Sequence, residues 1–234
     1  MKKQKGSVVA VMPAAGRGKR LRSKYPKPFV LIKSIPLFVR TLNTLMSAYP
    51  FDRVIVPAEE TCLSRMKKIA KRYHLNRVEF VRGGLTRAES VQNGLELLGL
   101  DEQIVLIHDM ARPFVSPKQI RQLIQKARHE GASVLALKVT STIKEINPTS
   151  GLIRKTLDRD RIYLAQTPQV FRSDLLRSAF RRRKNRLAVF TDEASMVESL
   201  KYPVSIVEGL STNIKITTPE DLKLAEAMLQ GELV

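Results

Sequence analysis

Short runs of apolar residues alternate along this chain with segments whose apolar residues recur at helical spacing. The runs are rich in β-branched residues, as in SVVAVM at 7–12 and IVLIH at 104–108, which is typical of strands buried on both faces of a sheet. Strands that alternate with helices predict parallel pairing, because each crossover must pass over one face of the sheet. We therefore expect an α/β fold, a Rossmann-like, mostly parallel twisted sheet flanked by helices.

This alternation can be followed from residue 7 to residue 137. Strands are expected at 7–12, 53–56, 78–81, 104–108 and 132–137. Helices are expected at 36–49, 62–73, 86–98 and 116–129. Two of the helix starts carry capping signals: TRAE at 86–89 has the pattern of a capping box, and Ser116-Pro117 has that of an N-cap followed by a first-turn proline.

The pattern changes at about residue 139. Two alternating segments, 142–146 and 152–157, flank the turn-forming sequence NPTSG, which predicts a β-hairpin. An isolated two-stranded arm is marginal in water, so we expect it to pack against something. No repeat or composition break indicates a second domain, so 1–234 is interpreted as a single domain with a hairpin arm at about 139–159.

Beyond the arm the pattern resumes with shorter elements. Strands are expected at 163–165, 170–171, 204–207 and 214–216, the last two as edge strands. Helices are expected at 173–182, at 192–199 and from Thr218, where a cap residue is followed by Pro219.

Membrane-spanning and disulfide-stabilised proteins are excluded. No stretch approaches the roughly 18 consecutive apolar residues of a transmembrane helix. The single cysteine, Cys62, cannot form an internal disulfide and fits a reducing compartment. The basic and then apolar start resembles a secretory signal, but Pro13 interrupts it, and a buried first strand explains it better. We expect a cytoplasmic protein that binds no membrane.

The strongly basic composition predicts an anionic ligand. The chain has 41 Lys and Arg against 22 Asp and Glu, a net charge of +19. Such a field attracts the phosphates of nucleotides, nucleic acids or lipids alike. The densest cluster, at 177–186, lies at the end of an expected helix, where the helix dipole favours cations. No RNA-binding signature accompanies it, so we expect no nucleic-acid partner, and nucleic-acid binding is kept as a remote alternative.

The turn after the first strand, PAAGRGKRL at 13–21, is the strongest candidate for a phosphate site. Its small residues let a ligand approach the backbone, whose N–H groups form an anion cradle. It contains neither the Walker sequence G-x-x-x-x-G-K-[ST] nor the Rossmann fingerprint, because Leu21 stands at the third glycine position. Several cations follow the glycines: Lys19, Arg20, Arg22, Lys24 and Lys27. This density favours a triphosphate over a dinucleotide; a plain tight turn with solvated cations is the alternative.

The segment PAAGxGxR followed by Pro26-Lys27 resembles the signature loop of sugar nucleotidyltransferases. Further motifs occur in the order found in one branch of that superfamily: GGxxRxxSV at 83–91, HDxARP at 108–113, DR at 158–159, TPQ at 167–169, TDEAS at 191–195 and NIK at 213–215. Together they resemble the 2-C-methyl-D-erythritol 4-phosphate cytidylyltransferase family of the non-mevalonate isoprenoid pathway. The resemblance extends from Val8 to about Leu229.

The resemblance implies that CTP and a sugar-alcohol phosphate react to give a diphosphocytidyl product and pyrophosphate. An anionic phosphate is already a nucleophile, so catalysis would consist of positioning and of stabilising charge with cations and Mg²⁺. The chain lacks a GxSxG motif, a Cys–His pattern and a histidine cluster.

The resemblance implies the following roles for the residues at the matched positions. The catalytic set is Arg20, Lys27, Arg159 and Lys215. The nucleotide-binding set is Ala14, Ala15, Gly16, Gly84, Ser90 and Asp109, with Gly84 and Ser90 at the cytosine edge and Asp109 also near the metal, which the phosphates would mainly hold. The acceptor-binding set is Arg112, Thr142, Arg159, Thr167, Thr191 and Lys215.

The family's hairpin arm crosses to the neighbouring subunit, so the resemblance implies a homodimer whose active sites each use a partner's arm. Three positions depart from the family pattern: Pro28 replaces a glutamine, Met110 an alanine, and Leu85 an often acidic residue near the base. A relative that transfers CMP to a pentitol phosphate, such as ribitol 5-phosphate, is the alternative enzyme. His108, at the end of a buried strand, is expected to be hydrogen-bonded and structural.

Overall fold

The computed structural model describes residues 6–16 and 18–231; Arg17 of the glycine-rich turn lies outside the described residues. The seven strands of the main sheet are β1 (Val8–Val11), β4 (Arg53–Ala58), β5 (Val78–Arg82), β6 (Ile104–Ile107), β7 (Ala132–Lys138), β10 (Tyr163–Arg172) and β11 (Ser205–Glu208). They are hydrogen-bonded in the order β11-β7-β10-β6-β1-β4-β5. Every neighbouring pair is parallel except the two formed by β10, which runs antiparallel to β6 and β7. The expected α/β class with a mostly parallel sheet is confirmed.

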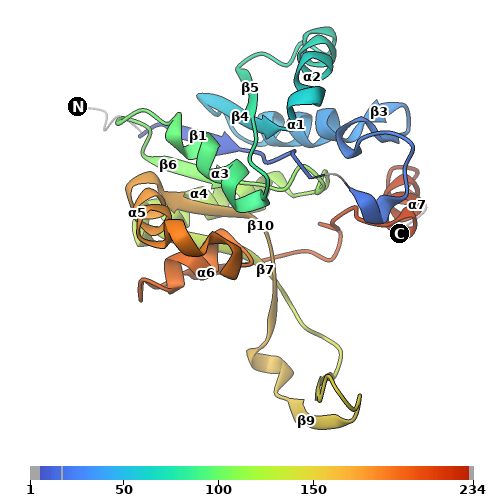
Figure 1. The fold of residues 1–234 in the computed structure, drawn as a ribbon, viewed down its shortest axis with the longest axis vertical. Coiled ribbons are helices and arrows are strands. Elements are labelled where there is room, and N and C mark those ends of the chain that lie inside the picture. Colours follow the sequence, from blue (N-terminus) through green and yellow to red (C-terminus); the bar gives the residue numbers. More distant parts are fainter. Residues whose placement is uncertain (1–5, 17, 232–234) are drawn as a thin grey trace.

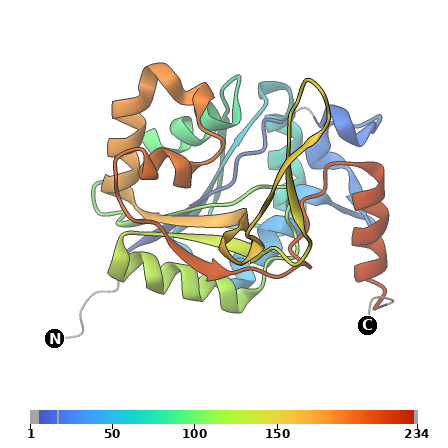
Figure 2. The ribbon, with the colours of Figure 1, turned by 90° about the horizontal axis from the view of Figure 1, so that it is seen from below.

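Helices cover both faces of this sheet (Figure 2). They are α1 (Leu37–Ala48), α2 (Glu60–Arg72), α3 (Arg87–Glu96), α4 (Pro117–Glu130), α5 (Ser173–Arg183), α6 (Glu193–Glu198) and α7 (Pro219–Met228). Val8 and Ala10 of β1 face a core shared with α1, α2 and α4, whereas Val9 and Val11 face α3, α5 and α6. Within the described part of the chain, no helix is long and apolar enough to cross a membrane.

The register of the central strands determines where a ligand can bind. Val11 of β1 lies opposite both Ile107 of β6 and Ile55 of β4. The chain segments that follow β1 and β6 therefore leave the sheet at the same edge. Ligands of open α/β sheets bind beyond the carboxyl ends of the strands, which is this edge.

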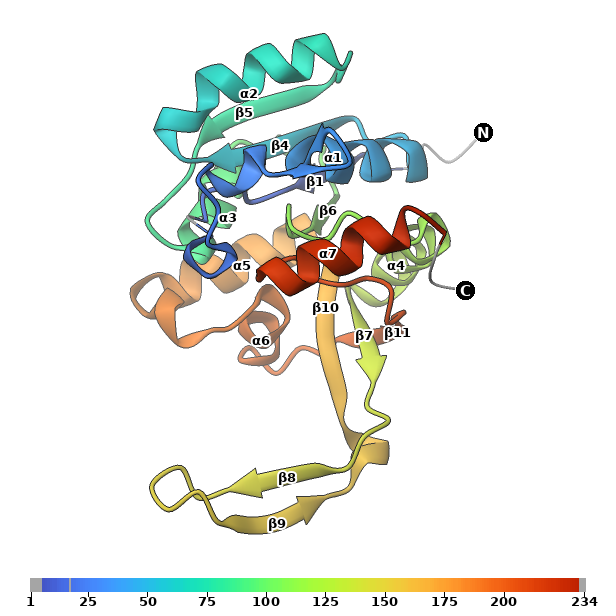
Figure 3. The same ribbon diagram turned by 90° about the vertical axis from the view of Figure 1, so that its right-hand side faces the viewer.

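The predicted hairpin is present as an arm formed by β8 (Ile143–Ile146) and β9 (Ile153–Leu157), which pair antiparallel. It projects far from the sheet and its helices (Figures 1 and 3). The side chains of Ile146, Leu152 and Ile153 on the arm are 53%, 70% and 62% exposed. The arm thus leaves apolar side chains uncovered within one copy of the chain.

Two predictions about the elements are corrected, and the structure adds two strands. Segments 163–165 and 170–171 belong to one strand, β10, whose pairing with β7 is irregular between Ala165 and Gln169. Residues 214–216 form no strand: Ile216 N–H donates to the carbonyl oxygen of Ala111, so this segment bonds to a loop and not to a strand. Two short strands, β2 (Leu31–Ile32) and β3 (Ile35–Pro36), were not predicted.

Candidate active site

A cavity of about 160 Å³ lies where β1 and β6 leave the sheet. Its walls come from the glycine-rich turn, the start of α3, the segment after β6 and the segment before α7. Eight sequence-predicted residues line it: Ala14, Ala15, Gly16, Lys27, Gly84, Ser90, Asp109 and Lys215. The structure therefore brings together residues that are as far as 201 positions apart in the chain (215 − 14).

Two glycine-containing segments, the turn after β1 and the segment before α3, shape the wall. A Cβ placed on Gly16 would meet no atom within 4 Å, so the backbone there is open to a ligand. Ser90 Oγ accepts a hydrogen bond from Gly84 N–H at 3.1 Å and donates to the carbonyl oxygen of Thr86 at 2.9 Å. A Cβ on Gly84 would overlap the side chain of Glu89. Ser90 and Gly84 thus fix the entry to α3, and Leu85 between them is fully exposed at the cavity wall.

Lys27 is a cation whose charged form this environment disfavours. Burial lowers its pKa from 10.5 to about 8, with further lowering from Lys215 and Arg20, while Asp109 opposes the change. Within the described part of the chain its ammonium forms no ion pair. The charge of Lys27 therefore has no ion-pair partner among the residues that the structure describes, which suits a site that binds an anion.

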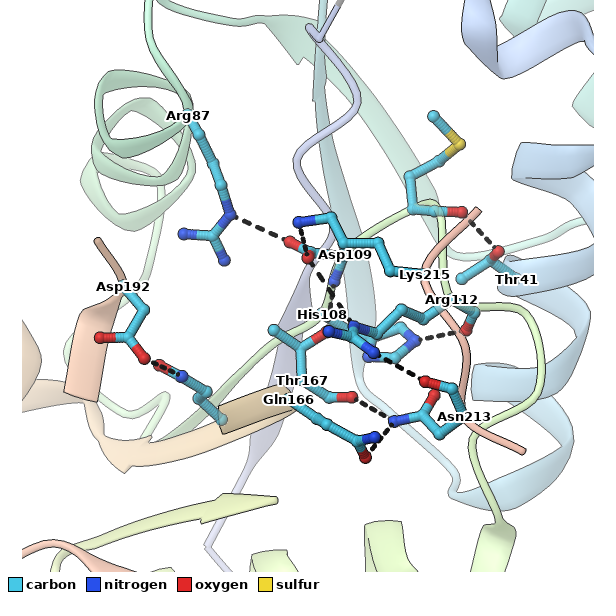
Figure 4. A network of polar contacts seen from close by, with 12 residues as sticks. Thr41, Arg87, His108, Asp109, Arg112, Gln166, Thr167, Asp192, Asn213 and Lys215 are labelled. Atoms are coloured by element: carbon cyan, nitrogen blue, oxygen red, sulfur yellow. Dashed lines mark hydrogen bonds and ion pairs between the residues drawn. The ribbon is translucent and has the colours of Figure 1, made fainter. Parts of the chain in front are cut away.

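Asp109, buried just after β6, forms ion pairs with three cations: Arg87 and Lys215 at hydrogen-bond distance, and Arg112, whose Nε lies 3.9 Å from Oδ2 (Figure 4). Its Oδ1 accepts from Arg87 Nε at 2.9 Å, and its Oδ2 lies 2.6 Å from Lys215 Nζ. Burial raises the pKa of Asp109, but Arg87 and Lys215 outweigh burial and hold this pKa well below its usual range. Asp109 is therefore ionised, and it fixes the position of Lys215.

Two residues important to this geometry received no role from the sequence. Arg87 lines the cavity, and its Nη1 and Nη2 contact Oε1 and Oε2 of Glu193 at 2.7 and 3.0 Å. Glu193 is 1% exposed. Both stand inside recognised motifs, GGxxR and TDEAS, but no local pattern predicts contact between residues separated by 106 positions.

The segment before α7 is anchored by Asn213, which is buried (Figure 4). Its Nδ2 donates to Gln166 Oε1 and to the carbonyl oxygen of Thr167, both at 3.0 Å. Thr167 Oγ1 in turn accepts from the backbone N–H of Asp109 at 3.0 Å. These contacts explain why residues 214–216 cross the sheet edge as an irregular segment that carries Lys215 to Asp109.

Six predicted residues do not line the cavity. Arg112 lies nearby, donating from Nη1 to the carbonyl oxygen of Asn213 at 2.7 Å. Thr167 lies beneath Asp109, and Arg20 is exposed on the 3-10 helix Lys19–Leu21, close enough to influence Lys27. Thr191 lines a neighbouring cavity of about 240 Å³ that shares Arg87 with the first. The remaining two, Thr142 and Arg159, are exposed residues of the arm.

His108 has the structural role that its position predicted. It is completely buried, and its Nε2 lies 2.9 Å from the carbonyl oxygen of Arg112. Burial lowers its pKa to about 4, so the ring is neutral at pH 7. This buried, neutral ring shapes the loop that carries Arg112.

A metal ion at this cavity would depend on the phosphates of a bound substrate for most of its coordinating oxygens. The described residues contain no group of three or more His, Cys, Asp or Glu side chains able to hold a metal ion. Of the described residues that line the cavity, Asp109 alone has a carboxylate. Mg²⁺ commonly takes one or two carboxylates together with substrate phosphates and water, and the donor set fits that mode of binding.

The family profile described as 2-C-methyl-D-erythritol 4-phosphate cytidylyltransferase matches residues 8–231. The chain is 42% identical over 231 residues to the protein of that name from Syntrophus aciditrophicus, covering 97% of this chain and 98% of the relative. It is 40% identical over 226 residues to the protein of the same name from Bacillus velezensis, covering 96% of each.

Solved structures agree with these sequence matches. The fold is similar to 4-diphosphocytidyl-2C-methyl-D-erythritol synthase from Anaerococcus prevotii, with a TM-score of 0.86, 30% identity and 96% coverage of both chains. It is also similar to 2-C-methyl-D-erythritol 4-phosphate cytidylyltransferase from Thermus thermophilus, with a TM-score of 0.76, 31% identity and coverage of 96% and 98%. Because sequence and fold agree over nearly the whole length, the chain belongs to the 2-C-methyl-D-erythritol 4-phosphate cytidylyltransferase family.

Proposed function

We propose that this protein transfers CMP from CTP to 2-C-methyl-D-erythritol 4-phosphate, giving 4-diphosphocytidyl-2-C-methyl-D-erythritol and pyrophosphate in non-mevalonate isoprenoid synthesis. The observation that supports this best is the cavity that Lys27 and Lys215 line together with the glycine-rich turn. Two ammonium groups beside a wall of small residues that is open at Gly16 suit a triphosphate and a second phosphate. Membership of the family supplies the identity of the nucleotide and the acceptor.

The reaction is an in-line displacement. An oxygen of the acceptor phosphate forms a bond to the α-phosphorus of CTP, while the bond from that phosphorus to the bridging oxygen of the β-phosphate breaks. The bonding electron pair leaves with pyrophosphate. The attacking oxygen is already anionic, so no side chain has to remove a proton from it, and the protein acts by positioning and by charge.

Lys27 and Arg20 would stabilise the charge that develops around the α-phosphate. Lys27 is favoured for this role because its ammonium lacks an ion-pair partner among the described residues and lines the cavity. A phosphate that binds beside it raises its pKa again and keeps it protonated. Arg20 is exposed and free to turn toward a bound triphosphate.

The nucleotide would lie along Ala14, Ala15 and Gly16, with its base beside Gly84 and Ser90. Small residues at these positions support close contact between the ligand and the backbone. Leu85 at the same wall offers no polar side-chain group to the base, so backbone N–H and carbonyl groups would supply the recognition of cytosine.

The acceptor would be held by Arg112, Thr167, Thr191 and Lys215, together with Thr142 and Arg159. The last two are exposed on the arm of this copy, so the proposal assigns them to a neighbouring subunit's site in a homodimer. The uncovered side chains of Ile146, Leu152 and Ile153 support an arm that packs on a second copy. The catalytic assignment of Arg159 depends on this exchange.

Mg²⁺ would bind beside Asp109 and take most of its ligands from the phosphates. When bound, the ion neutralises charge on the triphosphate and on the leaving pyrophosphate. Asp109 would orient Lys215 toward the same region. Cys62 is buried and unpaired, which is consistent with the reducing cytoplasm where we place the enzyme.

The test is pyrophosphate release with CTP, Mg²⁺ and each acceptor in turn. We expect turnover with 2-C-methyl-D-erythritol 4-phosphate and far less with ribitol 5-phosphate or without an acceptor. Turnover with ribitol 5-phosphate alone would replace the proposed acceptor with a pentitol phosphate. If no sugar-alcohol phosphate supports pyrophosphate release, and the protein is retained on RNA in a salt-sensitive way, the nucleic-acid-binding alternative would be favoured.

A further inference from the structure

The buried carboxylate of Glu193 is an ion-pair partner of the site although it does not line the main cavity. It begins α6 directly after Asp192, whose side chain caps that helix by accepting from Ser195 N–H at 2.9 Å. Its two oxygens contact both terminal nitrogens of Arg87, at 2.7 and 3.0 Å. This is the bidentate geometry in which a guanidinium and a carboxylate hold each other most firmly.

Arg87 has one further donor, and that donor reaches the catalytic region. Nε donates to Asp109 Oδ1 at 2.9 Å, while Asp109 Oδ2 pairs with Lys215 Nζ at 2.6 Å (Figure 4). Charges therefore alternate in a row: Glu193, Arg87, Asp109 and Lys215. Only Glu193 lies outside the main cavity, and α6 fixes its position.

This row makes the position of Lys215 depend on Glu193, because the guanidinium of Arg87 that lies between them is rigid and planar. While Glu193 occupies Nη1 and Nη2, only Nε is directed at Asp109 Oδ1. Oδ2 is then left for Lys215 at 2.6 Å, with Arg112 Nε more distant from the same oxygen at 3.9 Å. Without the Glu193 charge, the terminal nitrogens lose the partner that holds them, and the side chain at position 193 is itself almost completely buried, so breaking the pair is costly. They would turn to the nearest carboxylate, Asp109, and compete with Lys215 for it.

We propose that Glu193 is a positioning residue for CMP transfer: by holding both terminal nitrogens of Arg87, it reserves one oxygen of Asp109 for Lys215 and so sets where the Lys215 ammonium lies. This inference rests on the proposed function, because Lys215 is assigned there to the acceptor phosphate. Glu193 itself touches no substrate. Its effect reaches the reaction through Arg87 and Asp109.

The chain offers a matched control. Glu102 is 9% exposed and also holds an arginine by two contacts, from Arg53 Nε at 2.8 Å and from Arg53 Nη2 at 2.9 Å. It precedes the start of β6, whereas Asp109 follows the end of the same strand. The substitutions Glu193→Gln and Glu102→Gln therefore break similar pairs, one beside the cavity and one remote from it.

Steady-state kinetics and thermal unfolding separate positioning from stability. We expect Glu193→Gln to lower kcat by about tenfold to a hundredfold, the scale of a misplaced catalytic group, with a smaller change in the KM for CTP. Glu193→Asp keeps the charge and should recover part of kcat. Glu102→Gln should lower the Tm and leave kcat unchanged. A wild-type kcat in Glu193→Gln, or equal kcat losses in the two glutamine variants, would overturn the proposal.

Two measurements cover the remaining outcomes. If Glu193→Gln does not fold, the kcat of Glu193→Asp, measured well below its Tm, decides the question: a lower kcat supports positioning, and a wild-type kcat contradicts it.

Amine-selective labelling followed by mass spectrometry tests the position of Lys215 without any turnover. Lys215 should react several-fold faster in Glu193→Gln or Glu193→Asp than in wild type or Glu102→Gln, and equal rates would overturn the proposal. If wild type transfers CMP to no acceptor, the proposed function fails while the labelling still tests Glu193.

Discussion

Gly18 packs so closely against Lys27 that a Cβ on the glycine would lie 2.8 Å from the Lys27 Cβ. Gly18 also has a φ of +60°, in the left-handed region. The glycine-rich turn therefore supports the stem of the lysine that has the lowered pKa. A side chain at this position must move Lys27 or the turn.

We predict that Gly18→Ala lowers kcat at least about tenfold, because it displaces a group that acts by position. The left-handed backbone adds a stability cost of about 1 kcal/mol. Gly231→Ala is the control: its φ is +74° and its Cβ would meet no atom within 4 Å. Urea unfolding should show similar losses of stability in the two variants. Steady-state kinetics should show a lower kcat in Gly18→Ala alone. Equal kcat values would mean that the contact with Lys27 is unimportant.

Lys27→Ala should reduce turnover far more than it weakens CTP binding. Removal of one preorganised donor from developing charge costs about a hundredfold to a thousandfold in kcat. Calorimetric titration of CTP into the variant and steady-state kinetics measure the two effects separately. Turnover at the wild-type level would contradict the role assigned to Lys27.

The pH dependence should report the same lysine. Its pKa of about 8 means that the ammonium is largely protonated below pH 8 and loses its charge as the pH rises above 8. We therefore expect kcat/KM for CTP, which reports the free enzyme, to fall as the pH rises through about 8. In Lys27→Arg the group stays charged, and this decrease should vanish. The same decrease in Lys27→Arg would assign it to another group.

The arm exchange can be tested by mixing two defective variants. Arg159→Ala damages the arm and Lys27→Ala damages the cavity, so each homodimer should be impaired. A mixed dimer contains one site with a normal arm and a normal cavity, so re-equilibrated mixtures should recover up to about a quarter of wild-type activity. If each arm served its own subunit, mixing would restore nothing.

Chelation should stop turnover without unfolding the protein. EDTA removes the divalent ion from the CTP complex, and added Mg²⁺ should restore pyrophosphate release. The described residues contain no side-chain cluster for a metal, so the Tm of the nucleotide-free protein should not change with EDTA. A large decrease in that Tm would reveal a resident metal ion that the proposal lacks.

Elements specified by local chemistry were predicted well from the sequence. The Thr86–Glu89 capping box is present at α3, and Thr218 and Asp221 form another at α7. Ser116 stands at the expected N-cap of α4, but its side chain makes no capping hydrogen bond. The alternation of strands and helices predicted the layers, because burial on both faces of a sheet leaves a clear apolar pattern.

Long-range relationships could not be predicted in the same way. The direction of β10 depends on how the chain returns from the arm. The spacing of apolar residues predicts a strand but does not indicate whether it runs parallel or antiparallel to its neighbours. The irregular path of residues 214–216 depends on buried contacts of Asn213 with Gln166 and Thr167. The pairing of Arg87 with Glu193 likewise exists only after the sheet has formed.

The arm leaves the main sheet after β7 and returns in β10, and these two strands are direct hydrogen-bonded neighbours. Topologically, the whole excursion is one enlarged connection between adjacent strands. Residues can therefore be added to or removed from its tip without shifting the register of the main sheet. The part of the molecule that reaches outward can diverge in length and sequence while the catalytic framework stays the same.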